Sequence, residues 1–270
     1  MHNKLKELKR ILVECGRVSV AFSSGVDSTF LLKVARDTLG KENVIAMTVD
    51  SCFIPRKEIK EAEEFCRQQD INLNVMSVDV LRLDEVKSNP VDRCYFCKKN
   101  IFTQIKEAST GYVVCEGSNV DDMSDYRPGM RAINELLVRS PLKEAGLTKA
   151  DIRALSKELL LNTWNKPSMA CLASRIAYNE EITSTKLSKV EMAEDYLEEL
   201  GFSKYRVRIH GEENKLLARI ELSEDDMNSV FSNRALIGSI NDKLKEIGFS
   251  YIALDMGGYR VGSMNEVINK

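Results

Sequence analysis

The strand-like segment 18–22 and the polar loop after it constrain the fold more than any other part of the sequence. Residues 18–22 form a short, mainly apolar run of the length expected for a buried strand. From Val26 onward, apolar residues recur at four-residue steps as far as Gly40, which is the pattern of a helix that ends at a glycine. The loop 23–28 between them is polar. A strand that passes so directly into a helix is typical of parallel α/β folds.

Short apolar runs and helical patterns continue to alternate through the first half of the chain. Further strands are predicted at 44–49, 74–78 and 112–115, and apolar residues from 59 to 66 mark a helix. This order predicts an α/β fold with a parallel sheet and helices on both of its faces. Such sheets bind ligands at the carboxyl ends of their strands, which is where the loop 23–28 lies.

The second half of the chain has a different pattern. It predicts a helix at 184–200, strands at 205–210 and 216–222, a helical stretch over 224–247 and a strand at 251–254. This order indicates a smaller α+β unit. Residues 165–179 are predicted to bridge the two halves, since Pro167 breaks regular structure. We therefore expect a first domain at 1–168 and a second at 169–270.

Composition and charge argue against several classes of protein. Lys and Arg number 39 against 41 Asp and Glu, a net charge of −2, so no global charge attracts nucleic acid. No apolar run approaches the roughly 20 residues that cross a bilayer. The amphipathic start of the chain lacks the apolar region of a signal peptide. We expect a cytoplasmic protein that binds neither membranes nor nucleic acid.

The loop 23–28 has the chemistry of an anion site. Its place between a strand and a helix points backbone N–H groups and the positive end of the helix dipole at a bound anion. Gly25 allows a phosphate to approach the backbone closely, and the three serines offer hydroxyl groups. Asp27 can bind Mg²⁺ or cap the helix. The loop is not a Walker loop, because no Gly-Lys-Ser/Thr follows.

Two segments of the chain place cysteines near basic residues, which favour thiolates. Cys94 and Cys97 form a Cys-x-x-Cys pair, and Cys171 lies in the bridge. The residues leave three roles open: a redox pair, a zinc site that lacks an obvious fourth ligand, or a [4Fe–4S] cluster. Three thiolates would leave one iron of such a cluster open to another ligand.

The loop resembles the Ser-Gly-Gly-x-Asp-Ser PP-loop of the ATP pyrophosphatase superfamily, whose members cleave ATP to AMP and pyrophosphate. Ser24 stands where that motif has its first glycine. The resemblance implies ATP and Mg²⁺ as ligands, bound by Ser23, Ser24, Gly25, Asp27 and Ser28. It also implies that Thr48, at the end of the second strand, lies near adenine, and that Gly117, after the fourth strand, lies near the phosphates.

The whole chain is similar to the LarE family of sulfur transferases, which make pyridinium-3,5-bisthiocarboxylic acid mononucleotide for the nickel-pincer cofactor of lactate racemase. The matching stretches are 23–33, 93–98, 117–122, 125–129, 166–175, 206–208 and 254–263. The Cys-Leu-Ala-Ser-Arg and Gly-Tyr-Arg-Val-Gly-Ser stretches are the most specific of these.

The resemblance implies a reaction. ATP adenylates a carboxylate of pyridinium-3,5-biscarboxylic acid mononucleotide, and a sulfur nucleophile then expels AMP. In one branch of the family a lone cysteine, matched here by Cys171, gives up its own sulfur. The presence of Cys94 and Cys97 indicates the other branch, in which three cysteines hold a [4Fe–4S] cluster that carries a sulfide. A sulfide donor and a homo-oligomer are implied as partners.

The resemblance also implies roles for charged residues. Arg206 and Arg208 share one face of a strand, which from spacing alone is either a binding site or a solvated edge strand. The resemblance favours binding of the substrate phosphate by both, with Arg260 as a weaker candidate. Lys98 neutralises phosphates or is a surface lysine. Ser174 and Arg175 position the acyl group or cap a turn. Asp121 and Asp122 bind Mg²⁺ or form a turn. The family analogy implies that Glu194 serves a site shared between subunits, whereas on sequence alone Glu194 is expected to be an exposed helix residue.

Three other functions remain open at this point. A tRNA thiolase combines a PP-loop with a [4Fe–4S] cluster, but it needs a basic face for the RNA backbone. An amidating PP-loop enzyme uses ammonia and has no need of the three cysteines. A nucleotide-binding or cluster-carrier protein would bind ATP without cleaving it.

Overall fold

The computed structural model describes residues 1–124, 128–167, 170–212, 215–260 and 262–263. The chain forms two compact units. The first unit comprises residues 1–80 and 92–170, and the second comprises residues 81–91 and 171–270. The boundary expected at 168/169 falls on residues outside the described part of the chain.

The first unit contains a parallel sheet. Its strands are β1 (Val18–Ala21), β2 (Val44–Asp50), β3 (Asn72–Ser77) and β4 (Val113–Cys115), in the order β3-β2-β1-β4. Val18 is paired with Val44 on one side and with Val113 on the other. All three pairings are parallel. The predicted α/β fold class is therefore confirmed.

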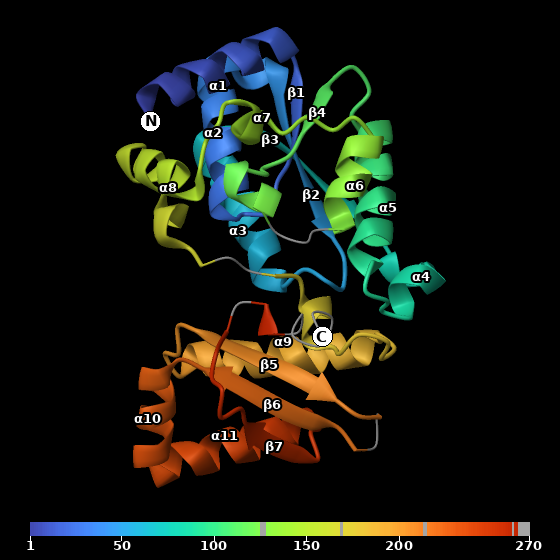
Figure 1. Ribbon diagram of the computed structural model, residues 1–270, viewed down its shortest axis with the longest axis vertical. Helices are drawn as coiled ribbons and strands as arrows, with labels where there is room; N and C mark the ends of the chain where they lie inside the picture. The colour runs from blue at the N-terminus through green and yellow to red at the C-terminus, as the bar shows by residue number, and fades with distance from the viewer. Residues whose placement is uncertain (125–127, 168–169, 213–214, 261, 264–270) are drawn as a thin grey trace. The chain divides into compact units, whose positions relative to one another are not determined.

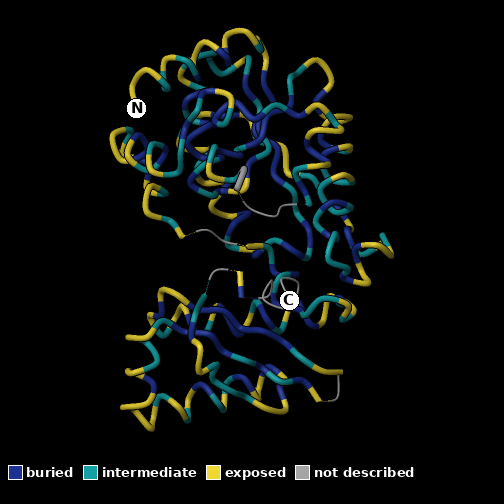
Figure 2. Tube along the Cα trace, viewed as in Figure 1, coloured by how far each residue is buried: buried dark blue, intermediate teal, exposed yellow. Residues whose placement is uncertain are grey.

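Helices cover both faces of this sheet (Figure 1). One face packs on α1 (His2–Cys15), α2 (Val26–Leu39), α3 (Arg56–Gln69), α7 (Pro141–Glu144) and α8 (Lys149–Glu158). The other packs on α5 (Arg93–Ala108) and α6 (Pro128–Glu135). Successive strand residues point to opposite faces, so Ala46 joins the first core while Met47 joins the second. The central strands β1 and β2 are mostly buried, as Figure 2 shows.

The second unit is an α+β unit, as predicted. Its sheet has the order β5-β6-β7, with β5 (Tyr205–His210) antiparallel and β7 (Tyr251–Leu254) parallel to β6 (Leu217–Leu222). Helices α4 (Asp84–Lys87), α9 (Ser184–Glu199), α10 (Glu224–Ser232) and α11 (Arg234–Ile247) complete it. The helical stretch predicted over 224–247 is two helices, because Asn233 ends α10 and its side chain caps α11.

Short 3₁₀ segments connect these elements. They are Lys41–Asn43, Val80–Arg82, Val120–Ser124, Asn162–Asn165 and Leu172–Arg175. Among the described residues, no helix is long and apolar enough to cross a membrane.

Candidate active site

The PP-loop joins the carboxyl end of β1 to the first turn of α2. Gly25 is the N-cap residue of α2, with an extended backbone that lets the helix begin at Val26. The Ser28 hydroxyl holds the loop closed, because it accepts the Ser23 N–H at 3.3 Å and donates to the Gly25 carbonyl at 3.2 Å. The first turn of α2 thus begins within the loop, where its N–H groups can meet an anion.

Ser24 has the backbone conformation that explains why the motif usually has glycine there. Its φ angle is +55°, in the left-handed region that glycine adopts without strain. The Ser24 side chain is buried, and its hydroxyl donates a 3.0 Å hydrogen bond to the Glu58 carbonyl in α3. This bond offsets part of the strain, so a serine can serve at a glycine position.

Thr48 fixes the position of β2 beside the start of the loop. It is buried, and its hydroxyl donates to the Phe22 carbonyl at 3.0 Å. Phe22 in turn donates its N–H to the Met47 carbonyl at 2.8 Å. The hydroxyl of Thr48 is therefore engaged with the strand that enters the PP-loop.

Gly117 lies directly against the PP-loop backbone. A Cβ atom on Gly117 would stand 3.0 Å from the Ser28 nitrogen and 3.3 Å from the Asp27 carbonyl carbon. Only glycine lets the segment after β4 approach α2 so closely. On the same segment, the Asn119 side chain donates to an Asp27 oxygen at 3.4 Å.

Asp27 forms an ion pair with Lys149, at the start of α8, that sequence reasoning missed. Lys149 Nζ lies 2.5 Å from Asp27 Oδ2. Burial raises the pKa of Asp27 above its ordinary value, although Lys149 acts in the opposite direction. A partly buried carboxylate at this position fits an oxygen ligand for Mg²⁺. The ammonium group of Lys149 beside it fits a phosphate.

Asp121 and Asp122 serve as turn and cap residues in this structure. Asp122 Oδ2 accepts the Asn119 N–H at 2.9 Å, and Asp121 Oδ2 accepts the Lys149 N–H at 2.8 Å. These bonds hold the segment after β4 and the start of α8 together.

A second lysine, Lys166, also reaches the PP-loop. Its ammonium group donates to the Ser24 carbonyl at 3.1 Å and forms an ion pair with Glu61. No local pattern predicted these contacts, because 122 and 142 residues separate Lys149 and Lys166 from their partners in the loop. The sequence marks Lys166 only as the start of a stretch that matches the family.

Cys94 and Cys97 lie in the first turns of α5, a helix that sequence reasoning did not predict. Both side chains are half-buried, and a Cys-x-x-Cys spacing places them on one helix face. Arg93 donates to the Cys94 sulfur at 3.8 Å. Lys98 packs its stem on α6, where a Cβ on Gly129 would lie 2.6 Å from Lys98 Cδ.

Cys171 belongs to the second unit, whereas Cys94 and Cys97 belong to the first. Within the described part of the chain, no three His, Cys, Asp or Glu side chains form a group that could hold a metal ion. None of the seven cysteines there forms a disulfide.

Arg175 fixes the segment that carries Cys171. The guanidinium group is fully buried and forms a bidentate ion pair with Glu194, at 2.9 and 2.8 Å. It also donates to the Cys171 carbonyl at 3.1 Å and to the Ser174 hydroxyl at 3.0 Å. Glu194 is 5% exposed and accepts the Val207 N–H, so the expectation of an exposed Glu194 was wrong. Its partners lie 13 and 19 residues away, outside helical periodicity.

Arg206 and Arg208 are buried on β5. Arg208 forms a bidentate pair with Glu221 at 3.0 Å and donates to the Ser174 carbonyl at 2.7 Å. Arg206 lies 5.1 Å from the centre of the Tyr259 ring. Burial lowers the pKa of Arg206, and the positive charge of Arg175 lowers it further.

Buried charged side chains surround Arg206. They are the guanidinium groups of Arg175 and Arg208 and the carboxylates of Glu194 and Glu221. Arg260, in the Gly-Tyr-Arg stretch, donates to the Gly258 carbonyl at 3.3 Å.

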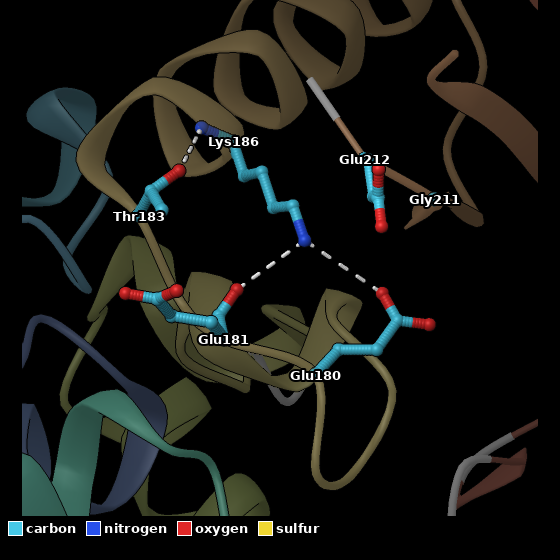
Figure 3. Close-up of a pocket in the computed structure, with 6 residues that line it drawn as sticks. All are labelled: Glu180, Glu181, Thr183, Lys186, Gly211 and Glu212. Atoms are coloured by element: carbon cyan, nitrogen blue, oxygen red, sulfur yellow. Dashed lines mark hydrogen bonds and ion pairs between the residues drawn. The ribbon is translucent and has the colours of Figure 1, made fainter. Parts of the chain in front are cut away.

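A pocket of 470 Å³ in the second unit has the opposite charge (Figure 3). Its lining residues are Glu180, Glu181, Thr183, Lys186, Gly211 and Glu212. Lys186 Nζ lies between Glu180, at 3.8 Å, and the Glu181 carbonyl, at 3.3 Å. Lys87 pairs with the Glu181 carboxylate at 2.8 Å, which leaves Glu180 and Glu212 against the Lys186 ammonium group. This negative balance disfavours a phosphate.

Comparison with known proteins identifies the family. Residues 3–108, which contain the PP-loop and the Cys-x-x-Cys pair, match the NAD synthase family model. The chain is 38% identical to pyridinium-3,5-bisthiocarboxylic acid mononucleotide synthase of Lactiplantibacillus plantarum, over 99% of this chain and 95% of that protein. This chain belongs to the LarE family.

Other proteins similar to this LarE family member have no assigned function. An uncharacterized protein of Synechocystis sp. is 37% identical over the full length of both chains. Another, from Methanocaldococcus jannaschii, is 31% identical over 95% of this chain and 97% of its own. The PP-loop domain and the relationship to a synthase make this chain an ATP-dependent enzyme, with Mg²⁺ as the metal that accompanies ATP.

Proposed function

We propose that this enzyme adenylates the carboxylates of pyridinium-3,5-biscarboxylic acid mononucleotide and replaces a carboxylate oxygen with sulfur. The observation that carries the proposal is near full-length similarity to a synthase of the bisthiocarboxylate, in a chain that also has a PP-loop and three cysteines near basic residues. The product belongs to nickel-pincer cofactor synthesis, and we expect the enzyme to act in the cytoplasm as a homo-oligomer.

The chain's own residues supply the adenylation step. The N–H groups at the start of α2 bind phosphate oxygens, and Lys149 and Lys166 neutralise them. A substrate carboxylate oxygen attacks the α-phosphorus of ATP, pyrophosphate leaves, and an acyl adenylate forms. Asp27 would hold Mg²⁺, which offsets charge on the leaving pyrophosphate.

The second unit contributes the substrate site in this proposal. Arg206, with Arg260 as the weaker candidate, binds the substrate phosphate. Arg208 holds the Ser174 carbonyl, and Arg175 holds the Cys171 carbonyl, so these two arginines position the sulfur-bearing segment. A sulfur nucleophile attacks the acyl carbon, the bond to AMP breaks, and a thiocarboxylate forms. In this proposal the domain at 1–168 binds ATP and the domain at 169–270 binds the substrate.

The sulfur source we propose is a [4Fe–4S] cluster held by Cys94, Cys97 and Cys171. Two half-buried thiols on one helix face, with arginine beside them, suit adjacent cluster ligands. When bound, the cluster supplies sulfide for transfer, and an external sulfide donor replenishes it. Lys98, one residue after Cys97, contributes positive charge near this helix turn.

Pyrophosphate release tests the adenylation directly. We expect pyrophosphate release only when the biscarboxylate nucleotide is present. Bulk tRNA or ammonia added in place of that nucleotide should give no release. Release with tRNA, together with tight and salt-sensitive tRNA binding, would overturn the proposal in favour of a tRNA thiolase. ATP binding without any pyrophosphate would instead indicate a non-enzymatic carrier.

Anaerobic purification tests the cluster. We expect iron and acid-labile sulfide in the brown protein, and loss of both in Cys94→Ser and Cys97→Ser variants. Cys66→Ser is the matched control, because Cys66 in α3 is buried in the core of the first unit and is not a proposed cluster ligand. A colourless protein with stoichiometric zinc, or without metal, contradicts the cluster.

A further inference from the structure

Two cysteines outside the sites described above lie together in the first unit. Cys15 is the last residue of α1, and Cys115 is the last residue of the edge strand β4. Gly16 ends α1 with a positive φ angle and turns the chain into β1, which pairs with β4. The two side chains pack in the same core and shift each other's pKa, and the Cys115 thiol also donates to the Val113 carbonyl at 3.7 Å.

Arg139 completes the cluster from a third segment. Its Nη1 donates to the Cys15 sulfur at 3.8 Å, and its backbone bridges to Cys115 beside β4. Arg139 also forms an ion pair with Glu144, which keeps the guanidinium group in place. Two thiols and a cation from three segments therefore meet at one point.

The environment makes the two thiols unequal. The pKa of Cys15 is lowered to about 7, chiefly by the hydrogen bond from Cys115 and further by the charge of Arg139. Burial and the charges of Glu144 and Glu14 act in the opposite direction. The same hydrogen bond, with burial, raises the pKa of Cys115 well above its ordinary value. Burial alone raises the pKa of Cys66, in the same core, to about 12. Cys15 is half-buried, whereas Cys115 is fully buried.

We propose that Cys15 and Cys115 form an oxidation site that reduces a peroxide and closes to a disulfide. The Cys15 thiolate attacks a peroxide oxygen, the O–O bond breaks, and the leaving oxygen takes up a proton to give water in the case of hydrogen peroxide. The Cys115 sulfur then attacks the Cys15 sulfenic acid, and its proton leaves with the hydroxyl group as a second water. Two thiols and one peroxide thus give one disulfide and two waters.

The disulfide would join α1 to β4, the strand that precedes Gly117. Gly117 in turn lies against the backbone of the PP-loop. Cys115 precedes that glycine by two residues. The site is separate from the three cysteines of the proposed sulfur transfer, and its test does not depend on that function.

Peptide mapping of the full-length protein tests the site. The reduced protein is treated with one equivalent of hydrogen peroxide, alkylated and digested. We expect a disulfide between the Cys15 and Cys115 peptides, with Cys66 alkylated as the matched buried thiol. In Cys115→Ser, dimedone should trap a sulfenic acid on Cys15. Oxidation of other cysteines while Cys15 and Cys115 stay alkylated would overturn the proposal.

Alkylation rates give a second readout that needs no variant. Iodoacetamide at neutral pH should modify Cys15 at least about ten-fold faster than Cys66, because the thiolate is the reactive form. Equal rates for the two cysteines would contradict the assignment of Cys15 as the attacking thiol.

Discussion

At the scale of single residues, Ser24 balances two opposed effects. Its left-handed backbone costs roughly 1 kcal/mol for a residue with a Cβ, and its hydrogen bond to Glu58 returns a similar amount, about 1 kcal/mol. The free protein therefore tolerates a serine at φ +55°.

Substitution of Ser24 separates these effects. Ser24→Ala keeps the strain and loses the bond, so it should lower the free energy of unfolding by about 1–2 kcal/mol. Ser24→Gly loses the bond but relieves the strain, and should stay within about 1 kcal/mol of the natural chain. Urea denaturation of the three proteins measures the order. A glycine variant less stable than the alanine variant would contradict this account.

Asp27 gives a prediction about pH. Its carboxyl group has a higher pKa in the folded than in the unfolded state, so the folded protein binds this proton more tightly. The contribution of Asp27 to the free energy of unfolding is therefore greatest in acid and is lost as the pH rises through the folded-state pKa. The stability of the natural chain relative to Asp27→Asn should therefore fall from acidic to neutral pH. Denaturation of both proteins across that range, without ATP, tests it. A difference that rises with pH would show that Lys149 outweighs burial.

Lys149 should contribute to nucleotide binding. Lys149→Met should weaken Mg–ATP binding about ten-fold, or about 1.4 kcal/mol, because a cation near the phosphates is lost. Lys4→Met is the matched control, since Lys4 also forms a long-range ion pair, 2.6 Å from Asp151. Calorimetric titration measures both. Equal affinities in the two variants would remove Lys149 from the site.

Residues with distant partners are those that the sequence did not reveal. The side-chain hydrogen bond of Ser24, the burial of Glu194 and the position of Lys166 each involve a partner 13 to 142 residues away. Periodicity reports only local neighbours, so the PP-loop could be found from its motif while its supporting lysines could not.

At the scale of elements, the contact between α2 and the segment after β4 is the tightest constraint on the loop. Gly117→Ala places a methyl group against backbone atoms that belong to a helix and cannot rotate away. We expect a loss of about 1–3 kcal/mol in stability and weaker Mg–ATP binding.

Gly238 provides the control for that substitution. It lies inside α11, and a Cβ there would meet no atom within 4 Å. Gly238→Ala should leave Mg–ATP binding unchanged and raise stability by about 0.5–1 kcal/mol. Unaltered nucleotide binding in Gly117→Ala would show that the segment after β4 can move away from the loop at little cost.

The elements differ in how far the sequence predicted them. The buried strands and α2 were found because their apolar residues repeat with the right period. Helix α5 was missed because cysteine, tyrosine and lysine interrupt its apolar face and no side chain caps its start. Helices α10 and α11 were read as one because Asn233 is a single residue between two helical patterns.

At the scale of the whole molecule, the two units are not continuous in sequence. Residues 81–91 join the second unit although the first unit surrounds them in sequence. The Asn89 carbonyl accepts the Asn179 N–H at 2.9 Å, and the Lys87 carbonyl accepts the Ile182 N–H at 2.8 Å. Such pairing between remote segments has no local signal in the sequence.

We propose that the whole enzyme uses cleavage of ATP to drive the replacement of a carboxylate oxygen by sulfur. The most direct test is an anaerobic single-turnover reaction with ATP, Mg²⁺, sulfide and the biscarboxylate nucleotide, in which pyrophosphate and thiocarboxylate are counted together. We predict one pyrophosphate for each sulfur in the product, and neither product with Asp27→Asn. Pyrophosphate released without sulfur in the nucleotide would contradict the account.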